Sequence, residues 1–139
     1  MKNICILLSV FFAIQFTNAQ KELPKIKQTL NDYMEGTANG EPARVKKAFH
    51  KDLNLYHIKN GELAVWKGTN YTNNIKEGKK SNRIGRIVSI DQEGNAAMAK
   101  IEIKMPNLKR IYTDYLMLLK IGEEWKIIHK SFSYKTESE

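Results

Sequence analysis

The chain has 139 residues, and its 23 Lys and Arg residues against 15 Asp and Glu residues give a formal net charge of +8. Its single cysteine, Cys5, excludes a disulfide within the chain and a site built from several thiolates. The basic residues are scattered, without a basic motif interleaved with stacking aromatic residues. We therefore expect a solvated basic surface and no nucleic-acid partner.

The N-terminal residues have the pattern of a secretory signal peptide. Lys2 precedes an apolar run over residues 4–16, and small residues follow at 17–19. The run is too short for a membrane span, so we expect no stable membrane segment once the signal is removed. The sequence predicts a signal peptide over residues 1–19, one domain over residues 20–139, and a secreted or periplasmic protein.

The domain is expected to begin with helices. Residues 22–35 carry apolar side chains at helical spacing, with Pro24 tolerated in the first turn, and Gly36 and Asn39-Gly40 are expected to end this helix. A second, short helix is predicted over residues 42–49. Residues 69–80 are polar and predict a loose third helix or a loop.

Strands are expected to follow. In residues 52–59, Leu53, Leu55 and His57 share one face, and Asn60-Gly61 is a strong signal for a hairpin to residues 62–67. Further strands are predicted over residues 83–91, 96–105, 108–120 and 125–134. Helices followed by a curved antiparallel meander indicate an α+β fold of about six strands, with the helices packed on one face.

The last predicted hairpin, residues 114–120 and 125–132, lacks a clean alternation of apolar and polar residues. This predicts that both of its faces are covered, so its polar residues must be paired or face a cavity. The sequence does not determine which side chains of the second strand of this hairpin point inward, because a one-residue shift in register exchanges one set for another. The two sets are Ile128, Lys130 and Phe132, or Ile127, His129 and Ser131.

Several segments resemble the nuclear transport factor 2-like superfamily, and together they span nearly all of residues 20–139. They are Tyr33-Met34-Glu35-Gly36, residues 48–55, residues 94–101, Asp114-Tyr115-Leu116 and residues 125–132. Within the superfamily, the chain is most similar to the group labelled putative lumazine-binding proteins. The resemblance implies a cone-shaped barrel, in which a bent sheet wraps around two or three helices and leaves a pocket at the wide end. Ketosteroid isomerase, SnoaL-like cyclases and non-enzymatic modules share this fold, so it does not select a function.

The resemblance places three catalytic candidates in the pocket. His57 falls near the catalytic Asp of ketosteroid isomerases and can act as a general base; the alternative is a strand histidine bonded to backbone or facing solvent. Tyr33 falls near the tyrosine that donates to the oxyanion; the alternative is a core tyrosine. Asp114 lies near the second donor; the alternative is a structural pair with Lys130.

A cationic Lys130 favours an ionised Asp114, which cannot donate to an oxyanion, and this weakens isomerase chemistry in favour of an anionic or carbonyl-bearing ligand. His50, His57 and His129 are not at ligand spacing, so we expect no metal site and no cofactor. The expected ligand-binding residues are large or charged side chains on the predicted elements: Phe49, Leu55, Trp66, Tyr115, Met117, Lys130 and Phe132.

Three functions remain open at this point. The first is an exported protein that binds a small, mostly apolar molecule, with no established chemistry. The second is an enzyme of the isomerase or dehydratase type, with His57 as the base. The third is an interaction module that forms a homodimer through an exposed sheet face.

Overall fold

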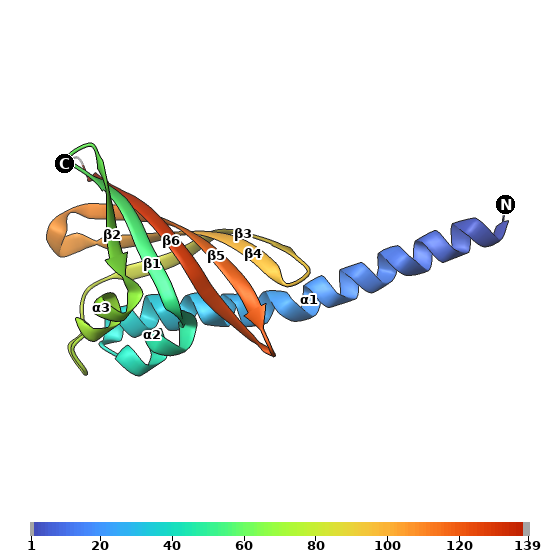
Figure 1. Ribbon diagram of the computed structural model, residues 1–139, viewed down its shortest axis with the longest axis horizontal. Helices are drawn as coiled ribbons and strands as arrows, with labels where there is room; N and C mark the ends of the chain where they lie inside the picture. Colours follow the sequence, from blue (N-terminus) through green and yellow to red (C-terminus); the bar gives the residue numbers. More distant parts are fainter. Residues whose placement is uncertain (1, 138–139) are drawn as a thin grey trace.

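A computed structural model describes the backbone of residues 2–137 and the side chains of residues 21–137. Within these residues the chain forms three α-helices, one short 3-10 helix and six strands. The α+β fold predicted from the sequence is confirmed, and the sheet curves around α1 without closing (Figure 1). The elements are α1 (Lys2–Asn39), α2 (Pro42–Ala48), β1 (Phe49–Lys59), β2 (Glu62–Lys67), α3 (Gly68–Asn73), β3 (Ile84–Glu93), β4 (Ala96–Met105), η1 (Pro106–Leu108), β5 (Arg110–Ile121) and β6 (Glu124–Thr136).

Helix α1 is longer than predicted at both ends. Its N-terminal part extends well beyond the sheet (Figure 1), and the predicted signal peptide lies outside the residues whose side chains are described. At its other end the helix continues through Gly36, where a Cβ would lie 2.8 Å from the Cγ2 atom of Val45. Gly36 therefore allows α2 to approach α1 closely and does not end the helix. Over the part of the chain described, no helix is both long enough and apolar enough to span a membrane.

The sheet has the strand order β2-β1-β6-β5-β4-β3 and is mixed, which corrects the purely antiparallel prediction. Strands β3 to β6 form an antiparallel meander, and β1 pairs with β6 in parallel. After β2, the chain passes through α3 to the far edge of the sheet before the meander begins. The meander then brings β6 back beside β1, and this long-range pairing leaves no local signal in the sequence.

The predicted β1–β2 hairpin is present. Asn60 and Gly61 both have positive φ angles, 54° and 84°, as a two-residue hairpin turn of this kind requires. Leu55 pairs with Trp66 across the hairpin, so both side chains lie on the same face of the sheet.

A β-bulge in β6 resolves the register left open by the sequence. Leu118 pairs with Ile127, whereas the preceding residue of β5, Met117, pairs with His129, so Ile128 is the extra residue. The buried side chains of β6 are consequently Trp125 and Ile127 before the bulge and Lys130 after it. Of the two sets of inward side chains left open by the sequence, the one with Ile127 is correct before the bulge and the one with Lys130 is correct after it.

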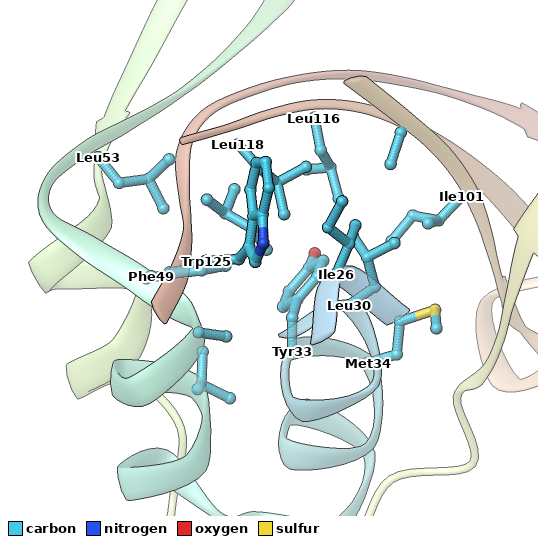
Figure 2. Close-up of a cluster of buried hydrophobic side chains, with 14 of the residues drawn as sticks. Ile26, Leu30, Tyr33, Met34, Phe49, Leu53, Ile101, Leu116, Leu118 and Trp125 are labelled. Atoms are coloured by element: carbon cyan, nitrogen blue, oxygen red, sulfur yellow. The ribbon is translucent and has the colours of Figure 1, made fainter. Parts of the chain in front are cut away.

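The core lies between α1 and the inner face of the sheet. Ile26, Leu30 and Tyr33 of α1 point toward the sheet, and Leu116 and Trp125 close over them (Figure 2). All five side chains are at most 2% exposed. This half of the cone is filled with apolar groups, so any cavity must lie elsewhere along the sheet.

The other face of β4 and β5 is exposed, which corrects the prediction that both faces of the last hairpin are covered. Tyr115, Met117 and Leu119 alternate with the buried residues of β5, and Met117 lies opposite Met98 of β4. Tyr115 is 52% exposed and Met117 is 48% exposed. We call this surface the outer face, and it is apolar and uncovered in the single chain.

Candidate functional site

A pocket of about 510 Å³ lies on the inner face of the sheet, toward the β1–β2 hairpin. Strands β1, β2, β4, β5 and β6 line it, together with Tyr33 of α1 and Tyr71 of α3. Aromatic rings dominate its wall, including Trp66, Tyr112 and Phe132. Its size and apolar wall are typical of a site for a small organic molecule.

Three polar side chains meet where the pocket borders the core. The Lys130 ammonium group lies 2.6 Å from Oδ2 of Asp114 and also donates to the hydroxyl of Tyr33. The Tyr33 hydroxyl in turn donates to the same Asp114 oxygen, at 2.9 Å. We call Tyr33, Asp114 and Lys130 the open cluster. The ion pair between Asp114 and Lys130, predicted as the structural alternative for Asp114, is present, and Tyr33 forms hydrogen bonds with both residues.

The open cluster is almost completely removed from solvent, since Tyr33 and Asp114 are 0% exposed and Lys130 is 5% exposed. Burial, together with the charge of Asp114, raises the pKa of Tyr33 well above its ordinary value. The phenol therefore stays protonated and remains a hydrogen-bond donor. Lys130 also lies 4.9 Å from the centre of the Phe132 ring, within the range of a cation–π contact.

The open cluster leaves hydrogen-bonding capacity unused. Oδ1 of Asp114 is buried and has no partner among the described residues, although Oδ2 accepts a hydrogen bond from Tyr33 and forms the ion pair with Lys130. An ammonium group has three N–H donors, and the contacts of Lys130 with Asp114 and Tyr33 account for two of them. A buried polar atom without a partner costs about 1–3 kcal/mol, so the site has an energetic reason to bind a group that pairs with it.

His57 has a similar unused atom. Its ring stacks on Phe132, with centroids 4.8 Å apart, and meets Trp66 edge-on. Its Nδ1 atom is buried and, within the described part of the chain, makes no hydrogen bond. The predicted alternative of a backbone-bonded histidine is therefore not seen at Nδ1, and the residue lines the pocket together with the open cluster.

Two arginines of the pocket were missed by the sequence analysis. Arg83 precedes β3 and donates to the hydroxyl of Tyr71 at 3.2 Å; Arg110 lies at the start of β5, with its guanidinium 4.3 Å from the centre of the Tyr134 ring. Each falls within a strand predicted from the sequence, but neither was singled out as a pocket residue. Their position follows from the curvature of the sheet, which has no local sequence signal.

The structure separates the predicted ligand-binding residues into three groups. Leu55, Trp66, Lys130 and Phe132 line the pocket. Phe49 is buried in the core against Tyr33, with ring centroids 5.0 Å apart, and borders a different hollow. Tyr115 and Met117 lie on the outer face and are absent from the pocket wall. The bulge and the strand alternation account for this separation, since residues 114 and 116 point inward and residues 115 and 117 point outward.

Metal ligands do not gather anywhere in the described part of the chain: it holds no group of three or more His, Cys, Asp or Glu side chains suited to an ion. The pocket itself offers one carboxylate, Asp114, and one imidazole, His57.

The profile of the family described as putative lumazine-binding matches residues 21–133. The chain belongs to this family. The match starts within α1 and ends within β6, so it covers β1 to β5, most of β6 and every residue of the open cluster. The family lies within the nuclear transport factor 2-like superfamily, to which similar solved structures also point.

Solved structures similar to this chain share its fold. A nuclear transport factor 2-like protein of unknown function from Silicibacter pomeroyi has a TM-score of 0.74 at 15% identity, over 84% of this chain and 98% of that one. Another, from Methylobacillus flagellatus, has a TM-score of 0.72 at 25% identity, over 84% and 94%. Among curated proteins, the chain is 28% identical over 101 residues to a protein of Cladobotryum sp. named aldolase FrzH, covering 72% of this chain and 81% of that protein.

Proposed function

We propose that this protein binds a small, largely apolar molecule in the pocket, and that the open cluster and His57 recognise a polar group of that molecule. The observation that carries the proposal is an aromatic wall beside two buried polar atoms, Asp114 Oδ1 and His57 Nδ1, that have no hydrogen-bond partner among the described residues. Ligand pockets are mostly apolar, with a few polar groups that fix orientation. Membership of the putative lumazine-binding family supports a small-molecule ligand.

A fluorescent apolar molecule, N-phenyl-1-naphthylamine, tests whether the pocket binds. We expect saturable binding of one molecule per chain, and Trp66→Ala should weaken it about 10- to 100-fold because truncating a large aromatic contact removes about 1.5–3 kcal/mol. Tyr115→Ala is the matched control, since Tyr115 is exposed to the same extent, 52%, but lies on the outer face.

The control also distinguishes the two apolar surfaces of the molecule. Binding that Tyr115→Ala weakens and Trp66→Ala leaves unchanged would place the molecule on the outer face and contradict the proposal. Absence of saturable binding to the unmodified chain would also contradict it.

A second candidate function is proton transfer next to a carbonyl group. The third N–H of Lys130 would polarise a carbonyl oxygen, and Asp114 Oδ1, which has no partner among the described residues, would accept a proton from the adjacent carbon. The carbon loses its proton to Asp114, and the resulting enolate oxygen is stabilised by the ammonium group. The relative named as an aldolase supports chemistry of this kind. In this proposal Asp114 is the first candidate for the general base. His57, the base expected from the sequence, is the second candidate.

Exchange of the α-protons of 2-tetralone for deuterium, followed by NMR in D2O, tests this activity. We expect the protein to accelerate exchange, and Asp114→Asn to abolish the acceleration. If His57→Gln abolishes it and Asp114→Asn does not, His57 is the base. Exchange at the rate of buffer alone would leave binding as the only function of the pocket.

Export and self-association belong to the proposal as well. The signal-peptide pattern of residues 1–19 supports export, and the family match begins at residue 21, just after it. Mass spectrometry of the exported protein tests this: a mass that corresponds to a chain beginning at Gln20 would support cleavage there, and a chain that still contains Lys2 would contradict it.

The apolar outer face supports a homodimer. Sedimentation of the protein as a monomer at micromolar concentration would contradict the homodimer.

A further inference from the structure

The wall of the pocket has more basic than acidic side chains. Its wall holds Lys59, Arg83, Arg110 and Lys130, whereas Asp114 is the only acidic residue among the described residues that line it. Asp114 is already paired with Lys130. Within the part of the chain that the structure describes, the other three cations of the pocket wall have no carboxylate partner.

Arg83 is the most confined of these three cations. It is half-buried, and its only hydrogen bond among the described residues is the one it donates to the Tyr71 hydroxyl at 3.2 Å. A guanidinium has five N–H donors in a fixed planar fork, so most of the fork of Arg83 is unused. Holding a charge away from water without a counter-ion is costly, which gives the site a preference for an anion.

Tyr71 connects Arg83 to the open cluster. Its hydroxyl accepts the hydrogen bond of Arg83, and its ring lies 5.6 Å from the Lys130 ammonium group. Burial disfavours the charged form of Arg83, but the hydroxyls of Tyr71 and neighbouring tyrosines outweigh this effect and raise its pKa above the ordinary value. Arg83 is thus a fixed, permanently charged donor on the same wall as Lys130.

We infer that the molecule bound in the pocket is an aromatic or otherwise planar carboxylic acid, and that the Arg83 guanidinium binds its carboxylate. This inference rests on the proposed binding function. A carboxylate matches the planar fork of arginine and can accept two parallel hydrogen bonds from it. The planar body of the molecule then lies among the aromatic rings of the pocket wall, which include Trp66 and Phe132.

Two compounds of nearly the same shape, one charged and one neutral, test the inference: naphthalene-2-carboxylate and naphthalene-2-carboxamide, titrated into the full chain by calorimetry. We expect the acid to bind about 10- to 100-fold more tightly than the amide, the range typical of a hydrogen bond to a charged group. Arg83→Met should remove this preference, so that the variant binds the acid and the amide with equal affinity; saturable binding of both also shows that the variant is folded. Arg83→Lys should retain part of the preference.

Arg86→Met is the matched control. Arg86 lies on β3, is exposed, pairs with Glu102 and is not part of the pocket wall, yet its substitution changes the net charge equally. We expect it to keep the preference for the acid. A preference lost equally in both variants would reflect overall charge and overturn the assignment to Arg83.

The remaining outcomes separate this inference from the proposed function. Equal binding of acid and amide to the unmodified chain would overturn the carboxylate assignment and leave the binding function intact. Tighter binding of 2-naphthyl phosphate than of the carboxylate would overturn the ligand class. Binding of neither the acid nor the amide would overturn the binding function and the inference together.

Discussion

Two polar clusters join helix α1 to the sheet, and they differ in how completely they are paired. In the first, which we call the closed cluster, Glu22 accepts from Lys120 at 2.9 Å with one carboxylate oxygen and from the Trp125 indole at 2.7 Å with the other. In the open cluster, both contacts of Asp114 go to Oδ2, and Oδ1 has no partner within the described residues. A fully paired cluster fastens the helix to the sheet, whereas an incompletely paired one beside a cavity is suited to bind a ligand.

The clusters also differ in exposure, which determines how much each one contributes to stability. The Glu22 and Lys120 side chains are 14% and 19% exposed, whereas Asp114 and Lys130 are 0% and 6% exposed. Water can replace a lost partner at the closed cluster more readily than at the open one.

The largest effect is expected from Asp114→Ala, which leaves the Lys130 ammonium buried without a counter-ion. We expect the free energy of unfolding, measured with urea, to fall by about 3–5 kcal/mol, the cost of breaking a buried pair. Asp114→Asn keeps the shape and should cost less. A loss below about 1 kcal/mol for Asp114→Ala would show that the open cluster is reached by water.

Tyr33→Phe is expected to have an intermediate effect. It removes the hydroxyl that donates to Asp114 and accepts from Lys130, so the free energy of unfolding should fall by about 1–3 kcal/mol. The same urea titration on Tyr115→Phe provides the control, because Tyr115 is exposed on the outer face and its substitution should leave stability unchanged. Equal effects of the two substitutions would mean that the Tyr33 hydroxyl contributes nothing to the open cluster.

The smallest effect is expected from Glu22→Gln in the closed cluster. The contact is partly exposed, so we expect a loss of about 0.2–1 kcal/mol at pH 7, as for other exposed ion pairs. A loss comparable to that of Asp114→Ala would remove the distinction between the two clusters.

The pH dependence of Glu22 sharpens this comparison. Hydrogen bonds from Trp125 and then Lys120 lower the pKa of Glu22 below its ordinary value of 4.5. Because the pKa is lowered on folding, the stabilisation is complete above pH 4.5 and is lost as the pH falls below it. The stability difference between the unmodified chain and Glu22→Gln should therefore shrink over this window in urea titrations at successive pH values. A difference that stays constant from pH 6 to pH 2 would contradict the assigned contacts.

Much of this fold could be predicted from the sequence because its signals are local. The helical spacing of Ile26, Leu30 and Tyr33, the alternation of Leu53, Leu55 and His57, and the Asn60-Gly61 turn each depend on neighbouring residues only. The parallel β1–β6 pairing and the bulge at Ile128 depend on contacts between distant segments, and neither was predicted.

The candidate site divides in the same way. Tyr33 and His57 were identified from the resemblance to ketosteroid isomerases. Asp114 and Lys130 also stood out because a polar residue in an apolar strand needs a partner or a cavity. Tyr115 and Met117 were misplaced because their side chains face outward, a direction that depends on which face of β5 packs on α1. Arg83 was missed because nothing local distinguishes an arginine facing a pocket from one facing solvent.

The most direct test of the binding account is a crystal structure of the protein with naphthalene-2-carboxamide. We predict that the compound lies in the pocket among the aromatic rings, with its amide group within hydrogen-bonding distance of Asp114 Oδ1, the Lys130 ammonium group or His57 Nδ1. A compound seated on the outer face, or a pocket filled by the protein's own side chains, would contradict the account.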